Sequence, residues 1–196
     1  MFAQLRAAVV STVLFTGLFG VAYPLGVTGL AQVLFPWQAN GSLVRAANGR
    51  IIGSALIGQP FARPEYLHPR PSAAGNGYDA TSSGGSNYGP LSADLAKRVA
   101  KDAKAVRAAD GKPDLPDDAV TASGSGLDPD ISPAYALLQA DRIAAARRID
   151  PNAVRRLIAG RIENPLLGFI GQPRVNVLMA NLALDAAFAK AQPHPA

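Results

Sequence analysis

The 196-residue sequence contains no cysteine. This absence excludes disulfide bonds and thiolate metal sites. Only two histidines occur, His68 and His194, too few for a conventional zinc site, and His194 lies in a proline-rich tail. The chain also has no Gly-x-x-x-x-Gly-Lys-Ser/Thr loop for binding phosphates. We therefore expect no metal site and no cofactor of its own.

An uninterrupted basic patch is also missing, although the formal net charge is +5. The basic side chains between 97 and 110 alternate with aspartates, and few aromatic residues lie among them. Such a pattern is typical of a solvated helix face or of a contact with acidic lipid headgroups. We expect membrane lipid, and no nucleic acid, among the partners.

Charge is absent from one long interval near the N-terminus. Between Arg6 and Arg45 lie 38 consecutive uncharged residues, and 7–23 are nearly all apolar. A membrane-spanning helix needs about 20 such residues. Pro24 interrupts the run, which a membrane helix tolerates with a kink, and Trp37 is an aromatic residue suited to the water interface. The sequence predicts a transmembrane anchor over 1–36.

A cleaved signal peptide is the alternative for this N-terminal segment. The apolar run is long for a signal peptide, and no clear Ala-x-Ala cleavage site follows it, so we favour a retained anchor. Positive charges lie on both sides of the run: Arg6 before it, and Arg45, Arg50 and Arg63 after it. The distribution of positive charge alone therefore does not define the topology.

The remainder predicts one soluble α+β domain over 37–190, followed by a disordered tail at 191–196. Asn48-Gly49 between apolar stretches predicts a β-hairpin. The Pro-, Gly- and Ser-rich stretch 60–90 predicts an ordered irregular loop, because it retains apolar anchors such as Tyr66 and Leu67.

Helices are expected in the second half of this domain. Apolar residues recur at helical spacing from Leu91, with Ser92 as a cap. Ser132-Pro133 predicts a helix running to about Arg148, and Asp150-Pro151 opens another that carries apolar residues as far as Ile162. A final helix follows Val175-Asn176-Val177, with Asn176 as its cap.

Several motifs in this order resemble one family, the C subunit of the Kdp potassium-transporting ATPase. They are Phe-Pro-Trp-Gln-Ala-Asn-Gly-Ser at 35–42, Gly-Ser-Ala-Leu-Ile-Gly-Gln at 53–59, Arg-Pro-Ser at 70–72, Ser-Gly-Gly-Ser-Asn at 83–87, Ser-Gly-Ser-Gly-Leu-Asp at 123–128, and the segments 171–173, 175–177 and 181–185. Together they cover nearly the whole chain.

The resemblance implies a single-pass subunit of the bacterial inner membrane, with a cytoplasmic N-terminus and an extracytoplasmic domain. It implies three partners: a channel-like K⁺-conducting subunit, a P-type ATPase subunit and a small membrane peptide. The Asp-Lys-Thr-Gly-Thr phosphorylation motif of P-type pumps is absent here. The expected role is therefore a non-catalytic accessory subunit that assembles the complex, while its partners handle ATP and K⁺. We also expect no carboxylate cluster in the domain, and hence no K⁺ site.

A second role implied by the family is that of a catalytic chaperone, which raises the ATP affinity of the ATPase subunit. A Ser/Gly-rich run can converge backbone N–H groups on an anion. The nucleotide-binding candidates are Ser83, Gly84, Gly85, Ser86 and Asn87, together with Gln139, which matches a family glutamine suggested as a nucleotide contact. Alternatively, the same run is a tight loop whose hydroxyls satisfy the protein's own backbone.

Partner-docking residues form the remaining candidate set. Prolines on both sides of Arg70 stiffen the backbone that presents it. Docking to the conducting subunit and hydrogen bonding within the domain are equally compatible with this arrangement. The docking candidates are Trp37, His68, Arg70, Ser72, Ser123, Ser125 and Asp128.

Two other classes of function compete with the accessory-subunit interpretation. A free-standing, membrane-anchored envelope binding protein would have the same polar loops and 16 prolines, and only the motif series argues against it. A nucleotide-binding regulator would bind an ATP analogue without partners.

Overall fold

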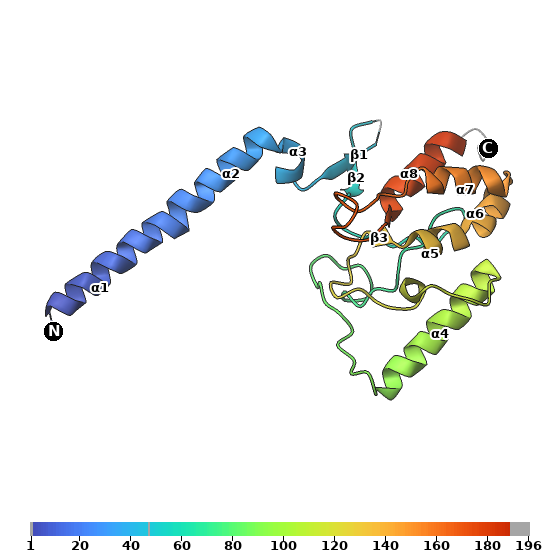
Figure 1. Ribbon diagram of the computed structural model, residues 1–196, viewed down its shortest axis with the longest axis horizontal. Helices are drawn as coiled ribbons and strands as arrows, with labels where there is room; N and C mark the ends of the chain where they lie inside the picture. The colour runs from blue at the N-terminus through green and yellow to red at the C-terminus, as the bar shows by residue number, and fades with distance from the viewer. Residues whose placement is uncertain (1, 47, 189–196) are drawn as a thin grey trace. The chain divides into compact units, whose positions relative to one another are not determined.

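The computed structural model describes residues 2–46 and 48–188 and divides the chain into two compact units, Met1–Ser54 and Ala55–Ala196 (Figure 1). The predicted tail at 191–196 lies outside the described residues. The structure confirms the α+β class, with one N-terminal helix long and apolar enough to span a membrane.

The first unit begins with that helix, which consists of α1 (Phe2–Phe15), the π-helical segment η1 (Thr16–Ala22) and α2 (Tyr23–Leu34). Its apolar part, Gln4–Leu34, has 31 residues and no buried position, and an 18-residue window within it has a mean hydropathy of 1.8. The π-helical turns end beside Pro24, and the Tyr23 N–H donates to the Leu18 carbonyl five residues earlier. Proline has no N–H and crowds the preceding turn, which explains the widened turns at this point.

A short helix and a hairpin complete the first unit. Helix α3 (Pro36–Ala39) leads to strands β1 (Leu43–Arg45) and β2 (Ile51–Ser54), which pair antiparallel with a bulge. Gly49 has a φ of 80°, a conformation that glycine adopts readily. The predicted Asn-Gly hairpin is confirmed.

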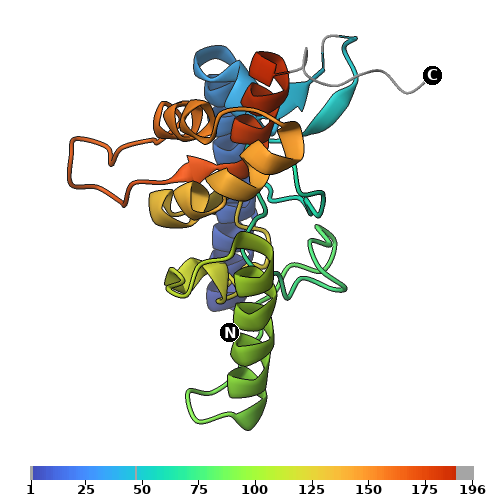
Figure 2. The same cartoon turned by 90° about the vertical axis from the view of Figure 1, so that its right-hand side faces the viewer.

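The second unit is mostly helix and loop (Figure 2). Its helices are α4 (Ala93–Asp110), the 3₁₀ turn η2 (Asp117–Ala119), α5 (Pro133–Leu138), α6 (Ala140–Arg147), α7 (Pro151–Ala159) and α8 (Val177–Phe188). A two-stranded antiparallel sheet joins β3 (Asp130–Ile131) to β4 (Val175–Asn176). As predicted, residues 60–90 contain neither helix nor strand.

Helices α5 to α8 surround the hydrophobic core of this unit. Ile143, Ile158 and Leu184 are fully buried there, and the irregular loop contributes Leu67, which is also fully buried. Burial of these side chains is the main favourable term for folding, at roughly 1.5–3 kcal/mol for each. The loop is therefore part of the core and not an appendage to it.

The predicted caps are confirmed. The Ser92, Ser132 and Asp150 side chains each accept a hydrogen bond from the first turn of the following helix, and Asn176 accepts one from the Met179 N–H at 3.1 Å. A side-chain oxygen at this position satisfies a backbone donor that has no partner within the helix. Gly111, with a φ of 66°, ends α4 as expected.

Three details of the helix predictions are wrong. The helix expected from Ser132 to Arg148 is divided at Gln139, whose ψ of −8° interrupts the α-helical geometry. Helix α7 stops before Ile162, because Gly160 follows Ala159 and glycine disfavours helix. Leu91 is 98% exposed and contributes nothing to the buried face of α4.

Candidate functional site: three loops around Arg70 and Asp128

The two Ser/Gly loops, 82–87 and 123–128, lie side by side. The Ser83 hydroxyl and the Gly84 N–H both donate to the Ser125 carbonyl, at 3.0 and 2.8 Å. A Cβ on Gly85 would lie 3.0 Å from the Gly124 carbonyl oxygen. Glycine thus permits a close approach of the two backbones. The two hydrogen-bond donors of the first loop, the Ser83 hydroxyl and the Gly84 N–H, are occupied by the Ser125 carbonyl of the second loop.

The Arg70 loop, 70–78, packs against the second Ser/Gly loop at Gly126. The Ser72 hydroxyl donates to the Gly126 carbonyl at 2.6 Å and accepts from the Tyr78 N–H at 2.8 Å. Gly126 has a φ of 67°, and a Cβ there would lie 2.6 Å from the Ala74 nitrogen. Only glycine fits this junction without displacing backbone.

An ion pair joins the same two loops. The Arg70 guanidinium contacts the Asp128 carboxylate at 2.9 Å and donates to the Thr121 carbonyl at 3.2 Å. The Tyr78 hydroxyl donates to the Arg70 carbonyl. Burial raises the pKa of Tyr78, so this hydroxyl remains a protonated donor at physiological pH.

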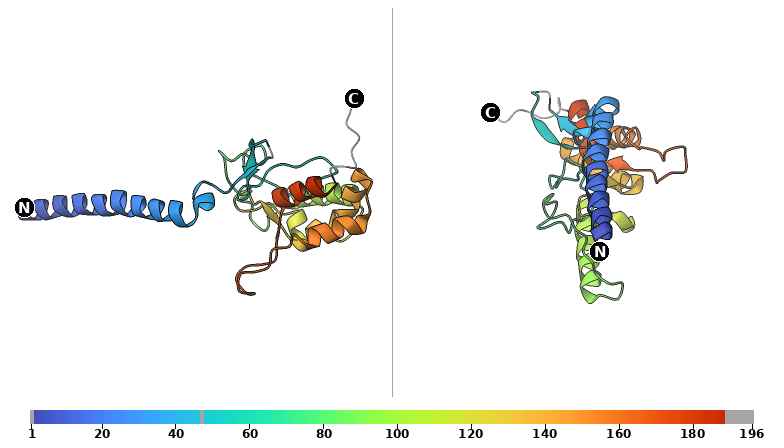
Figure 3. Two further views of the ribbon diagram at one scale, coloured as in Figure 1. Left: turned by 90° about the horizontal axis from the view of Figure 1, so that it is seen from above. Right: turned by 90° about the vertical axis from the view of Figure 1, so that its left-hand side faces the viewer.

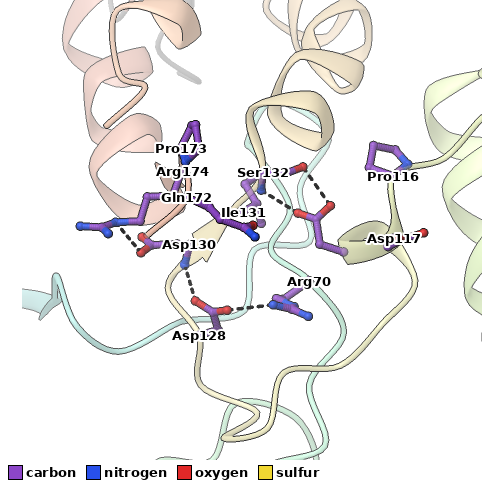
Figure 4. A pocket seen from close by; sticks show the side chains of 11 residues that line it. Arg70, Pro116, Asp117, Asp128, Asp130, Ile131, Ser132, Gln172, Pro173 and Arg174 are labelled. Carbon is purple, nitrogen blue, oxygen red and sulfur yellow. Dashed lines mark hydrogen bonds and ion pairs between the residues drawn. The ribbon is translucent and has the colours of Figure 1, made fainter. Parts of the chain in front are cut away.

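Arg70 and Asp128 lie at the edge of a cleft of about 540 Å³ (Figure 4). Asp130 reaches into the same cleft and contacts Arg174 at 3.0 Å. Burial raises the pKa of Asp130, and the charge of Arg174 opposes that rise.

Two further aspartates face this cleft from the 3₁₀ turn η2. Asp118 accepts from the Ser132 N–H and hydroxyl at 2.6 and 2.9 Å, whereas Asp117 is exposed. Four aspartates thus line the cleft with two arginines. The chain path brings together aspartates from the separate segments 117–118 and 128–130. Within residues 2–46 and 48–188, no group of three acidic or histidine side chains could hold a metal ion.

Gln139 and His68 lie together in a different place. Gln139 is 0% exposed: its Oε1 accepts from the His68 N–H at 2.7 Å, and its Nε2 donates to the His68 carbonyl at 3.0 Å. Asn181 makes the same pair of bonds to the neighbouring Leu67, at 2.7 and 3.0 Å. Two side-chain amides therefore hold consecutive peptide groups of the irregular loop, as a neighbouring strand would do. We call these four residues the amide clamp.

Buried arginines extend this clamp toward Pro64. Arg142 donates to the Tyr66 carbonyl at 3.0 Å and pairs with Asp110 at 2.8 Å, and Arg147 donates to the Glu65 carbonyl at 2.8 Å. Burial, aided by the nearby Arg142 charge, lowers the pKa of His68, so its ring is uncharged at neutral pH. Sequence reasoning missed the arginines, because a helical arginine carries no local sign that it will be buried.

The structure groups most of the predicted site residues. Seven of them meet in the three loops: Arg70, Ser72, Ser83, Gly84, Ser123, Ser125 and Asp128. Gly85 and Ser86 are half-buried in the first Ser/Gly loop, and Asn87 is exposed with a φ of 53°. His68 and Gln139 belong to the amide clamp. Trp37 lies in the first unit, where its indole N–H donates to the Leu43 carbonyl at 3.1 Å.

The family described as "K+-transporting ATPase, c chain" matches residues 5–186. The chain belongs to this KdpC family. It is 61% identical to a potassium-transporting ATPase KdpC subunit from Caulobacter vibrioides, over 96% of this chain and 95% of that protein. The KdpC subunits of Beijerinckia indica and Koribacter versatilis are 58% and 50% identical, over 96% and 98% of this chain and 96% and 97% of those proteins.

Membership confirms the resemblance found in the motif series. As a KdpC subunit of a K⁺-transporting ATPase, the chain is one component of a larger complex and has partner subunits. Its apolar N-terminal helix is compatible with a membrane anchor in such a complex. Membership in this family argues against the alternative of a free-standing envelope protein.

Proposed function

We propose that this chain is a non-catalytic accessory subunit that assembles and stabilises a K⁺-importing ATPase. Its anchor lies in the bacterial inner membrane with the N-terminus in the cytoplasm, and its domain is extracytoplasmic. Its partners are a K⁺-conducting subunit, a P-type ATPase subunit and a small membrane peptide. ATP and K⁺ are handled by those partners.

The observation that supports the proposal is that the polar groups of the candidate site form hydrogen bonds and ion pairs with one another and with the domain's own backbone. Ser72, Ser83 and Arg70 direct their donors to the domain's own backbone and carboxylates. A nucleophile needs a base within hydrogen-bond reach, but the only described histidine, His68, is held in the amide clamp. Groups fixed in this way support a rigid interaction module, because their geometry does not depend on a ligand.

Truncation at the boundary between the two units tests this function. A complex containing only residues 1–54 of this chain retains the anchor and hairpin but lacks the second unit. We expect its K⁺-stimulated ATPase activity to fall to background. A chain ending at residue 188 keeps all the described helices and is the control, expected to be fully active. Full activity of the 1–54 complex would refute an essential role for the domain.

A nucleotide contact is the second candidate function, and it would give the subunit its catalytic-chaperone role. The observation in its favour concerns Ser86 and Asn87. Among the described residues, their side chains make no hydrogen bond, and Asn87 is exposed. These groups are therefore available to phosphate oxygens, whereas Ser83 and Gly84 are engaged with Ser125.

Calorimetry with the full chain in detergent and a non-hydrolysable ATP analogue tests this candidate. We expect binding at millimolar concentration or below, weakened about tenfold by the S86A/N87A double substitution, as loss of roughly 1.4 kcal/mol would give. Asn164→Ala removes an exposed amide elsewhere and is the matched control. Absence of binding, or equal binding by the double variant, would exclude this loop as the nucleotide contact.

A further inference from the structure

Residues 163–174 form an arm that extends away from the helices of the second unit. Figures 2 and 3 show it as the orange loop between α7 and β4. At its base, Glu163 and Arg174 exchange two backbone hydrogen bonds, at 2.8 and 3.0 Å, and their side chains form an ion pair at 2.9 Å. The two ends of the arm are thus joined to each other, which closes its base.

The tip of the arm is apolar and exposed. The exposed fractions are 68% for Leu166, 75% for Leu167, 76% for Phe169 and 52% for Ile170. No charged residue occurs between Glu163 and Arg174. Soluble surfaces seldom present so many large apolar side chains together, and such clusters mark interaction sites.

The backbone of the tip is held in one conformation without a partner. Leu166 and Ile170 exchange backbone hydrogen bonds at 3.1 and 3.0 Å, and the Gly168 N–H donates to the Pro165 carbonyl at 3.0 Å. Leu167 has a φ of 55°, a conformation that is unfavourable for leucine. Such pre-organisation lowers the entropy cost of binding.

The base of the arm borders the acidic cleft. Gln172, Pro173 and Arg174 line the same cleft as the four aspartates, and Asp117 is exposed at its edge. With four carboxylates against two guanidinium groups, this surface is net negative. Anionic lipid headgroups would repel it, whereas a protein can present a cation next to an apolar pocket. Charge therefore favours a protein occupant over the bilayer.

We propose that the arm is a docking element: its tip enters an apolar pocket on a partner subunit, and a lysine or arginine beside that pocket enters the acidic cleft. The inference rests on the proposed function, since it concerns the assembly of this chain with its partners. It adds a surface to the predicted docking residues, none of which lies in the arm.

Co-purification tests the arm. The full-length L167D/F169D variant is co-expressed with the other transporter subunits, and the tagged chain is recovered in detergent. We expect at least about a tenfold loss of bound partner subunits, because two carboxylates would be buried in the apolar pocket. Leu91→Asp places a carboxylate at another exposed leucine and should leave recovery unchanged. Asp117→Lys should reduce recovery several-fold by reversing the charge at the cleft.

Circular dichroism of each purified chain checks that it is folded. We expect every variant to keep the wild-type spectrum, because all the substituted side chains are exposed. Undiminished recovery of partners with L167D/F169D would overturn the proposal. If the wild-type chain itself recovered no partner subunits, the proposed function would be refuted instead. The experiment therefore distinguishes failure of the docking proposal from failure of the proposed function.

A single-tryptophan variant distinguishes a protein pocket from lipid. Trp37 is the only tryptophan of this chain, so the emission of the W37F/F169W complex minus that of the W37F complex, whose partner subunits are identical, reports from the tip. In the reconstituted complex we expect blue-shifted emission that brominated lipids do not quench. Quenching by brominated lipids would place the tip in the bilayer and overturn the proposal, as would emission typical of a water-exposed indole.

Discussion

The G126A variant is expected to lose about 2–5 kcal/mol of unfolding free energy. We expect no other glycine-to-alanine substitution in the three loops to cost more. Its new Cβ would lie 2.6 Å from the Ala74 nitrogen and 2.8 Å from the Gly84 carbonyl oxygen. Both obstacles are backbone atoms, so no side chain can rotate away. The φ of 67° adds a conformational cost that every residue except glycine meets.

Gly111→Ala is the matched control for this prediction. Gly111 has a φ of 66°, nearly the same as Gly126, but a Cβ there would have no neighbour within 4 Å. The control therefore includes the conformational cost and omits the steric one, and we expect a loss of about 1 kcal/mol. Chemical denaturation of the two variants measures the difference. Equal losses of unfolding free energy in the two variants would mean that the three loops move apart at little energetic cost and are not rigid.

Replacing Asn181 with leucine is expected to lower the unfolding free energy by about 2–5 kcal/mol. The substitution nearly conserves volume but removes both hydrogen bonds to the Leu67 peptide groups. Leu67 is fully buried, so water cannot replace the lost partners, and each unsatisfied buried group costs roughly 1–3 kcal/mol. Half of the amide clamp would be lost.

Asn152→Leu makes the same exchange at an exposed position of α7, where the Asn152 side chain accepts a 3.2 Å hydrogen bond from Arg155. We expect a change within about 0.5 kcal/mol for this control. Thermal unfolding followed by circular dichroism compares the two variants. If Asn181→Leu were as stable as Asn152→Leu, the Asn181 half of the amide clamp would make no net contribution to the free energy of unfolding.

Local signals in the sequence predicted much of the fold. The charge-free interval after Arg6 predicted the long N-terminal helix, and Asn48-Gly49 predicted the hairpin. Ser132 and Asp150 marked the helix starts, because a cap depends only on the next two or three residues. The motif series predicted the family, which the comparisons confirmed. Docking by Arg70 and nucleotide contact by Ser86 remain predictions.

Tertiary structure alone decided the surroundings of these residues. Asn181 and Leu67 are 114 positions apart, and Gln139 and His68 are 71 apart, yet each pair shares two hydrogen bonds. No periodicity or spacing encodes such contacts, because they depend on the path of an irregular loop across the helices. The acidic cleft arose in the same way from two separate segments. The sequence also did not determine that the arm is exposed. The run Leu-Leu-Gly-Phe-Ile is compatible with a buried turn as well as with an exposed one, and only the packing of the folded chain distinguishes the two.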